Sequence, residues 1–525
     1  MSDSYPSPAT VPPRRPVRWW PAVTIVVLAV AALAWVWLGN ASQRQERNIG
    51  TAIVCVLSSF LLLLWCLFLS RLRWKIRLGI LATILGLGLL SATLFRFHGV
   101  SGDLVPILQW RWQTTAPVAF ESPQPGSAKT SAPSVQHFAG DWPQFLGPNR
   151  DCTLAQPALA RDWQAHPPQL LWRKSVGPAW SGFAVAGNRA ITQEQRGEEE
   201  VVVCYELLTG TPLWSHEDPV HFQSPLGGEG PRATPTIHAG RVYTMGATGI
   251  LSCLDAESGK RLWFRDTLKE NHAKLNEWGM SCSPLVTSNL VAVSVGGRDG
   301  RSLVAYRADS GEFAWGSGND GAGYSSPCRA ILAGVNQILI FNSGGISAHD
   351  PATGTNLWKY HWPGGHPHVA MPVVVSGDRV LVSSGYGTGS ELLQLQRETN
   401  GVLNASRIWK SNRLKAKFTN LLCRDGFVYG LDDGIMACLD LSNGQQRWKE
   451  GRYGHGQEIL VKDLLLVSAE SGDMVLLDPT PEASRELARF SALPGKMWNP
   501  PALAGDILLV RTEKEAACYR LPIKR

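Results

Sequence analysis

Aromatic and cationic residues recur along the chain in short Gly- and Pro-containing segments, each followed by a β-rich run. Nine of them are candidates for a ligand-binding site: Trp180, Arg232, Trp278, Tyr324, His366, His368, Lys417, His455 and Trp498. Aromatic walls with a few cationic groups suit a flat, anionic ligand such as a quinone carboxylate, because rings stack on rings and cations pair with carboxylates. The alternative is structural, since loops that converge at one end of a fold need Gly, Pro and aromatic residues for packing alone.

A metal site is a weaker alternative for two neighbouring histidines. His366 and His368 could supply imidazole nitrogens, which divalent metals accept as ligands. The sequence names no third ligand, and Pro367 between the two histidines predicts a turn. We therefore expect neither a metal ligand nor a catalytic residue in this set.

The elements that must position these residues belong to a repeat. A short apolar run is followed by Asp or Glu, then by Thr/Ser-Gly and shortly afterwards by Trp, as in residues 253–263 (CLDAESGKRLW) and 438–448 (CLDLSNGQQRW). The marker residues are Trp172, Trp214, Trp263, Trp315, Trp358, Trp409, Trp448 and, as a degenerate copy, Phe490. They recur about every 45 residues, which is the length of a four-stranded propeller blade. The repeat therefore predicts an all-β propeller.

Strands can be counted within one unit and at the ends of the repeat region. Four short β-rich runs separated by turn dipeptides lie at 233–238, 241–247, 250–255 and 261–265. This assignment puts the marker Trp on the outermost strand, where its ring can fill the space between blades. After Phe490 only three runs remain, and residues 170–173 can supply the fourth. A strand from the beginning that joins three from the end closes a ring of eight blades and removes the exposed edge.

The residues also resemble a known family. The opening of the repeat region, 141–151 (DWPQFLGPNRD), and the CLD…SG…LW units are similar to bacterial pyrroloquinoline-quinone-like (PQQ-like) β-propeller repeat proteins. The resemblance covers about 141–525 and implies the propeller fold. It leaves the activity open, because the superfamily includes quinoprotein alcohol dehydrogenases, which use PQQ, and a non-enzymatic lipoprotein that assists β-barrel assembly in the outer membrane.

The sequence departs from both kinds of relative. Quinoprotein alcohol dehydrogenases place a vicinal Cys-Cys disulfide over the quinone and hold Ca²⁺ with Glu, Asn and Asp, whereas here no two cysteines are adjacent and no acidic cluster has calcium-ligand spacing. The haem motif Cys-x-x-Cys-His is also absent. The lipoprotein has a lipidated N-terminal cysteine where this chain has apolar helices. We expect a binding or scaffold module of the cell envelope, with a PQQ-dependent dehydrogenase of an alcohol or sugar as the alternative.

Three apolar stretches without internal charges open the chain, at 20–38, 51–69 and 78–95. Each has about the 20 residues that a helix needs to cross ~30 Å of hydrocarbon. Arg and Lys precede the first stretch and fill the connection between the second and the third, so the positive-inside rule places the N-terminus in the cytoplasm. We expect an inner-membrane protein with the propeller on the periplasmic side.

These features divide the chain into a cytoplasmic tail (1–18), a three-helix membrane anchor (19–96), a Pro- and Ser-rich linker (97–140) and a propeller (141–525). The formal net charge is +7, but ten of the 50 basic residues and two of the 43 acidic ones lie in the first 100 residues. The remaining 425 residues are therefore nearly neutral, with 40 basic and 41 acidic side chains. Nucleic-acid binders concentrate positive charge on the globular domain, so this class is excluded. The expected partners are the membrane and an envelope protein or polymer.

Overall fold

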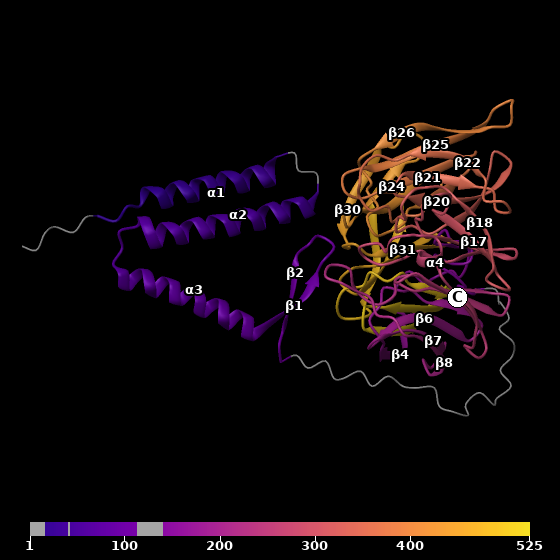
Figure 1. The fold of residues 1–525 in the computed structure, drawn as a ribbon, viewed down its shortest axis with the longest axis horizontal. Coiled ribbons are helices and arrows are strands. Elements are labelled where there is room, and N and C mark those ends of the chain that lie inside the picture. Colours follow the sequence, from indigo (N-terminus) through magenta and orange to yellow (C-terminus); the bar gives the residue numbers. More distant parts are fainter. Residues whose placement is uncertain (1–15, 40–42, 113–139, 525) are drawn as a thin grey trace, which may run out of the picture. The chain divides into compact units, whose positions relative to one another are not determined.

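The computed structural model describes residues 16–39, 43–112 and 140–524. It divides into two compact units, Met1–Thr115 and Ala116–Arg525 (Figure 1). The first unit contains three long helices and a hairpin, and the second is built from β-sheets. Residues 113–139, most of the expected Pro- and Ser-rich linker, lie outside the described residues.

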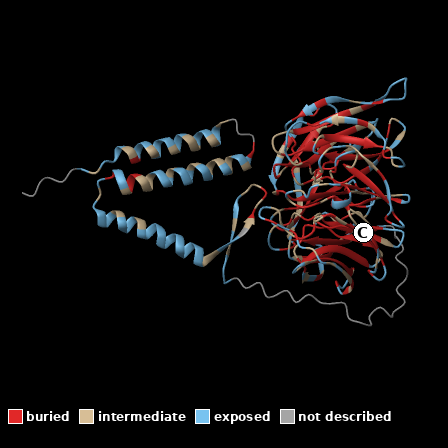
Figure 2. Ribbon diagram, in the orientation of Figure 1, coloured by how far each residue is buried: buried red, intermediate tan, exposed pale blue. Residues whose placement is uncertain are grey.

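Three helices make up most of the first unit: α1 (Trp20–Leu38), α2 (Arg44–Leu64), which continues as the π-helical turn η1 (Trp65–Leu69), and α3 (Trp74–Leu94). The first coincides with a predicted apolar stretch, whereas α2 begins before residue 51 and α3 before residue 78, where charged residues precede the apolar runs. All three are long and apolar enough to cross a membrane. Few residues of these helices are buried, as their mostly tan and pale blue ribbons show (Figure 2), and many of the exposed residues are large and apolar. An outward apolar surface is what a helix in a bilayer requires, because lipid tails replace the protein core.

Polar contacts join the helix ends. At one end the indole of Trp65 donates to the main-chain oxygen of Arg18 at 2.8 Å, and Arg77 in the first turn of α3 donates to a carbonyl of η1. At the other end the indole of Trp37 donates to the hydroxyl of Thr51 at 3.1 Å. The start of α1, the end of α2 and the start of α3 therefore lie on one side of this unit.

A hairpin follows α3 directly: β1 (Phe95–Val100) pairs with β2 (Pro106–Trp110). The segment expected to be a linker from residue 97 thus begins with regular structure. Its Pro- and Ser-rich composition belongs to the later part and obscured the alternating apolar residues at its start.

Eight sheets of four or five strands form the second unit within residues 140–524. We number them in the chain order of their consecutive strands, and we call the earliest of these the first strand; β3 and β4, which join sheets 7 and 8 from earlier in the chain, are left out of this order. Sheets 1–4 consist of β5 (Ala184–Ala186), β6 (Arg189–Arg196), β7 (Glu199–Glu206) and β8 (Pro212–Asp218); β11 (Thr236–His238), β12 (Arg241–Met245), β13 (Ile250–Asp255) and β14 (Arg261–Asp266); β15 (Leu285–Thr287), β16 (Leu290–Ser294), β17 (Leu303–Arg307) and β18 (Phe313–Ser317); β19 (Cys328–Leu332), β20 (Val335–Asn342), β21 (Gly345–His349) and β22 (Asn356–His361). Sheets 5–8 consist of β23 (Val373–Val375), β24 (Arg379–Ser384), β25 (Gly389–Arg397) and β26 (Leu403–Ser411); β27 (Leu422–Arg424), β28 (Phe427–Asp432), β29 (Ile435–Asp440) and β30 (Gln446–Arg452); β31 (Gln457–Val461), β32 (Leu464–Ser468), β33 (Asp473–Pro479) and β34 (Ser484–Ser491), with β3 (Thr153–Leu154) parallel to β31; and β35 (Ala502–Ala504), β36 (Ile507–Arg511) and β37 (Glu515–Arg520), with β4 (Gln169–Ser175). Loops contain the short pair β9 (Gln223–Ser224) and β10 (Gly228–Glu229) and the helix α4 (Thr267–Glu270).

The last sheet is completed by a strand from the start of the second unit. Trp172 of β4 pairs with Cys518 of β37, and the carboxylate of Glu515 lies 2.9 Å from the guanidinium of Arg173. This confirms the prediction that residues 170–173 supply the missing strand. Joining the two ends of the chain in one sheet leaves no open edge there.

Most of the marker tryptophans form a hydrogen bond to the neighbouring sheet. They lie on the outermost strands, as predicted, and six of them donate the indole N–H to a turn carbonyl of the following sheet at 2.8–3.2 Å. The turn glycine has a positive φ, +71° at Gly259, and a Cβ there would come within 2.4 Å of the Trp214 ring. Glycine alone meets both requirements, which explains the recurring Thr/Ser-Gly. Trp358 is an exception and donates to Gln337 of its own sheet at 2.6 Å.

Candidate functional site

The loops that precede the first strands of the eight sheets converge on one face, because hydrogen bonds join each loop to the next. The amide of Gly182 donates to the hydroxyl of Thr234 at 3.2 Å, the amide of Thr234 to Ser283 at 3.0 Å, and the amide of Ser283 to Ser326 at 2.9 Å. The series continues through Tyr324–His368, Met371–Asn420, Phe418–Gln457, Gln457–Trp498 and Asn499–Ser181. We call this surface the funnel face; it comprises residues 177–183, 227–235, 276–284, 321–327, 366–372, 412–421, 453–457 and 495–501.

One cluster on the funnel face contains three of the nine predicted site residues. The rings of Trp180 and Trp498 have centroids 5.1 Å apart, and the ammonium of Lys496 lies 3.8 Å from the Trp498 ring and 4.8 Å from the Trp180 ring. Phe418 contacts both Trp498, at 5.2 Å, and His455, at 5.3 Å. Loops of sheets 1, 6, 7 and 8 thus contribute to one aromatic surface with a cation on it.

A second cluster brings together Arg232, Trp278 and Tyr324. Arg232 Nε donates to the main-chain oxygen of Trp278 at 2.7 Å, and Nη2 donates to the carbonyls of Gly227 and Gly228 at 3.0 and 2.8 Å. The Trp278 and Tyr324 rings are 5.4 Å apart, and the Trp278 amide donates to the Tyr324 hydroxyl at 3.3 Å. Arg232 Nη1 is buried without a hydrogen-bond partner. Most donors of this guanidinium therefore hold loops in place.

Glu200, a buried carboxyl group whose charge acts on Arg232, changes its protonation close to neutral pH. Burial raises the pKa of Glu200 to about 7, although the amide of Ala247 and the charge of Arg232 lower it. Burial also lowers the pKa of Arg232 to about 10, against the raising effect of Glu200. Arg232 stays charged at pH 7, whereas the charge of Glu200 responds to small changes in pH.

Of the remaining predicted residues, His366 and Lys417 both contact the ring of Tyr386, whereas His368 packs on another ring. The exposed ring of His366 stacks on Tyr386 with centroids 5.2 Å apart, and the ammonium of Lys417 lies 5.0 Å from the same ring. His368 is buried, stacks on Phe341 at 4.2 Å and has Nδ1 2.7 Å from a main-chain oxygen. Burial lowers the pKa of His368. Within the described part of the chain, no three His, Cys, Asp or Glu side chains lie close enough together to hold a metal ion.

Three residues that contact members of the predicted set were not among the nine. Phe418 and Lys496 are close in sequence to predicted residues, so a wider window around each loop would have included them. Tyr386 follows β24 instead of preceding a first strand. Its signal is the Gly-Tyr-Gly turn in which Tyr386 itself has a positive φ of +56°, unusual for a bulky residue.

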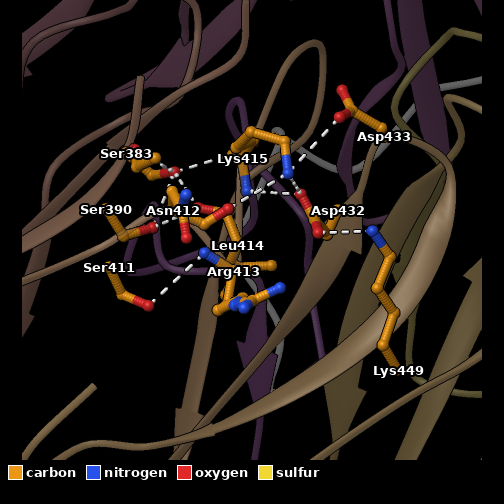
Figure 3. Close-up of polar contacts among 12 residues, drawn as sticks. Ser383, Ser390, Ser411, Asn412, Arg413, Leu414, Lys415, Asp432, Asp433 and Lys449 are labelled. Atoms are coloured by element: carbon orange, nitrogen blue, oxygen red, sulfur yellow. Dashed lines mark hydrogen bonds and ion pairs between the residues drawn. The ribbon is translucent and has the colours of Figure 1, made fainter. Parts of the chain in front are cut away.

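A buried ionic network holds the loop at 412–420 in place (Figure 3). Lys415 Nζ lies 2.5 Å from Asp432 Oδ1 and 3.4 Å from Asp433 Oδ2, and Lys449 Nζ lies 2.5 Å from Asp432 Oδ2. Two cations and two carboxylates balance, as buried charges require. The amide of Lys415 also donates to Asp432 at 3.0 Å. We infer that this network positions the loop at 412–420, because its lysines and aspartates pair with one another.

The opening motif lies across the opposite ends of the first strands. Trp142 bridges Val185 of β5, β3 pairs with β31, and the loop before β15 accepts two hydrogen bonds from Arg150. Arg150 is buried and donates to the carbonyl of Ser283 at 2.9 Å, next to the hydrogen-bonded loops of the funnel face. Residues 140–154 therefore contact the first strands of sheets 1, 2 and 7 and the loop before sheet 3.

Comparisons with known proteins agree with this architecture. The family model PQQ_2, described as outer membrane protein assembly factor BamB, matches residues 198–450. Quinohemoprotein alcohol dehydrogenase ADH-IIG of Pseudomonas putida is 28% identical over 232 residues, 39% of this chain and 31% of that protein. BamB of Moranella endobia is 28% identical over 257 residues, 46% of this chain and 63% of that protein. The chain thus spans less than two thirds of either relative.

A solved structure shows the fold. The crystal structure of quinohemoprotein alcohol dehydrogenase from Comamonas testosteroni covers 74% of this chain and 81% of its own, with a TM-score of 0.53 and 14% sequence identity. Proteins with this fold carry different activities, so fold similarity alone assigns none. This chain therefore carries PQQ-like repeats over residues 198–450, in a β-sheet unit whose fold resembles that of the Comamonas testosteroni enzyme.

Proposed function

We propose that this protein is a membrane-anchored binding or scaffold module of the cell envelope, whose eight-bladed propeller presents the funnel face to an envelope protein or polymer. The three outward-apolar helices support the anchor. The unbroken series of hydrogen bonds between eight sheets, and the completion of sheet 8 by β4, support eight closed blades. The matches to an outer membrane protein assembly factor support a role in the envelope.

The observation that carries the proposal is that the aromatic rings of the funnel face touch one another. A flat ligand held between two rings needs them about 7 Å apart, twice the ~3.5 Å contact distance between carbon atoms. The Trp180 and Trp498 centroids are 5.1 Å apart, and those of Trp278 and Tyr324 are 5.4 Å apart. Neither pair of rings therefore leaves a slot between its two members, which suits a large partner better than a small flat one.

The same residues do not fit PQQ, the cofactor of the alternative dehydrogenase. PQQ carries three carboxylates, which need cationic partners when they leave water. Arg232 already donates to three main-chain carbonyls, and Lys496 lies over two indole rings. The donor set of the described residues includes no cluster for a bridging metal ion. A PQQ-dependent dehydrogenase of an alcohol or sugar stays the second candidate on the similarity to ADH-IIG.

The proposed location is the inner membrane, with the N-terminus in the cytoplasm and the propeller in the periplasm. The start of α1, the end of α2 and the start of α3 lie together, and the basic residues Arg18, Arg71, Arg73, Lys75 and Arg77 flank these ends. Positive charge concentrates on the cytoplasmic side of membrane proteins, which supports this orientation.

Two measurements on the full-length protein test the function. In detergent, PQQ titrated with and without Ca²⁺ is expected to leave the tryptophan fluorescence and the titration heat unchanged at micromolar concentrations. Saturable binding that Arg232→Ala abolishes would favour the dehydrogenase. In cells, a photo-crosslinking phenylalanine analogue at Trp278 is expected to give discrete adducts, whereas the same probe at Leu262, an exposed residue of β14, is not. Identical adduct patterns at the two positions would contradict the funnel face as the binding surface.

A further inference from the structure

The hairpin β1–β2 has one apolar face and one polar face. Directly paired residues share a face, and the pairs Phe95–Trp110 and Phe97–Leu108 alternate with the pair Arg96–Gln109. The rings of Phe95 and Trp110 are 4.5 Å apart. The side chains of Phe97, Leu108 and Trp110 are nevertheless 60%, 59% and 52% exposed. A two-stranded hairpin is marginally stable in water, so this face needs a partner.

The position of the hairpin within the first unit is fixed at both ends. It begins at Phe95, the residue after the last residue of α3, and the amide of Arg111 donates to the carbonyl of Leu94 at 2.9 Å. At its tip the main-chain oxygen of Asp103 accepts a hydrogen bond from Asn48 of α2 at 2.8 Å. The hairpin therefore extends from the end of α3 to the beginning of α2, across the helix ends (Figure 1).

We propose that this hairpin is an interfacial anchor whose apolar face inserts into the lipid surface beside the helices. The inference rests on the proposed membrane anchoring. Because the hairpin starts where an apolar helix ends, it lies at the depth of the lipid headgroups, where Trp and other amphipathic aromatic residues are preferred. Only the inner edges of the two strands are paired with each other, so the hairpin must stay at headgroup depth, where water reaches the backbone groups on its outer edges. The exposed Arg96 is on the opposite face, toward water.

The test compares two neighbouring residues of β2 in the full-length protein. A Cys55→Ser background removes the exposed native cysteine. Leu108→Cys then carries an environment-sensitive fluorophore on the apolar face, and Gln109→Cys carries it on the polar face as the matched control. Both proteins are reconstituted into phosphatidylcholine–phosphatidylglycerol vesicles that contain lipids with a nitroxide near the headgroup. We expect blue-shifted emission and about twofold quenching at position 108, and little of either at position 109.

The outcomes separate the two proposals. Alkaline carbonate extraction shows whether the helices are inserted; release of the protein would refute the membrane anchor itself. With the protein inserted, equal quenching at both positions, or none at position 108, would overturn the interfacial hairpin. Blue-shifted but unquenched emission at position 108 would also overturn it, because protein, either the propeller or a second copy, would then cover this face.

Discussion

Glu458 of β31 is a buried carboxyl group whose replacement should stabilise the propeller. Its side chain is buried beside Gly430 of the neighbouring sheet, and neither carboxyl oxygen has a hydrogen-bond partner. Burial raises its pKa to about 8, and the approach of Thr419 and of the Leu431 main chain lowers it by less. Glu458→Gln keeps the shape of the side chain and removes the charge that burial opposes.

The expected effect depends on pH with a defined sign. In the unfolded chain this carboxyl titrates near 4.5, so between pH 4.5 and 8 the folded protein keeps a proton that the unfolded chain has lost. The contribution of Glu458 to the free energy of unfolding is therefore greatest below pH 4.5 and is lost as the pH rises toward 8. At 1.36 kcal/mol per pH unit the total loss is about 5 kcal/mol, of which about 3 kcal/mol falls between pH 6 and pH 9. Glu458→Gln removes this dependence.

Thermal melting of the full-length protein in detergent at pH 6 and pH 9 measures the difference. A propeller of roughly 385 residues has an unfolding entropy near 0.8 kcal/mol/K, so 3 kcal/mol corresponds to about 4 °C. The wild type should lose about 4 °C more than Glu458→Gln between the two pH values. Glu391→Gln is the control, because this buried carboxylate has Tyr360 at 2.7 Å and Lys410 at 3.1 Å; its Tm should fall at both pH values. Parallel pH dependence of wild type and Glu458→Gln, or a lower Tm of the variant at pH 9, would refute the reasoning.

Three further predictions concern the contact between neighbouring sheets, the completion of sheet 8 and the orientation of the protein in the membrane. Gly259→Ala should lower the Tm by several degrees more than Gly240→Ala, because both glycines have φ near +70° but only Gly259 contacts a tryptophan ring, that of Trp214; equal losses would show that the contact is unimportant. Deletion of 169–174 should abolish cooperative melting, since it removes most of β4 from sheet 8; an unchanged Tm would contradict ring closure. Protease added to intact spheroplasts should remove the propeller, whereas complete protection would contradict the periplasmic orientation.

The architecture could be predicted because each repeat contains the residues that form its turns and its contacts with the neighbouring sheet. Asp255 accepts hydrogen bonds from the amides of Glu257 and Ser258, Gly259 supplies the positive φ, and the ring that packs on it comes from the previous sheet. Each of these interactions depends on residue type and short spacing, which a sequence displays directly. The placement of Trp214 on an outermost strand follows from the same count.

The state of the funnel face could not be predicted in this way. The sequence indicates that Trp180 and Trp498 belong to loops at the same face, but these residues are far apart in the chain and are brought together by closure of the last sheet onto the first. Whether the rings leave a slot or touch depends on how far eight sheets taper toward the centre, a property of the whole ring. A rule based on loops before first strands also omits Tyr386, which reaches the same face from another turn.

The opening motif explains why the family resemblance specifies the fold strongly and the function weakly. Gly147 has a φ of +85°, and a Cβ there would lie 2.8 Å from the Trp142 ring. Arg150 donates to the carbonyls of Ser283 and Pro284, which lie just before β15 and outside its strand ladder. Strand ends at the centre of a ring leave such carbonyls without sheet partners, and a buried guanidinium with its several donors satisfies two of them at once. The motif therefore has a structural role, since Arg150 and Gly147 contact the protein's own backbone and the Trp142 ring. The contacts of this motif therefore identify no ligand, and the partner that we propose for this protein is to be sought at the funnel face.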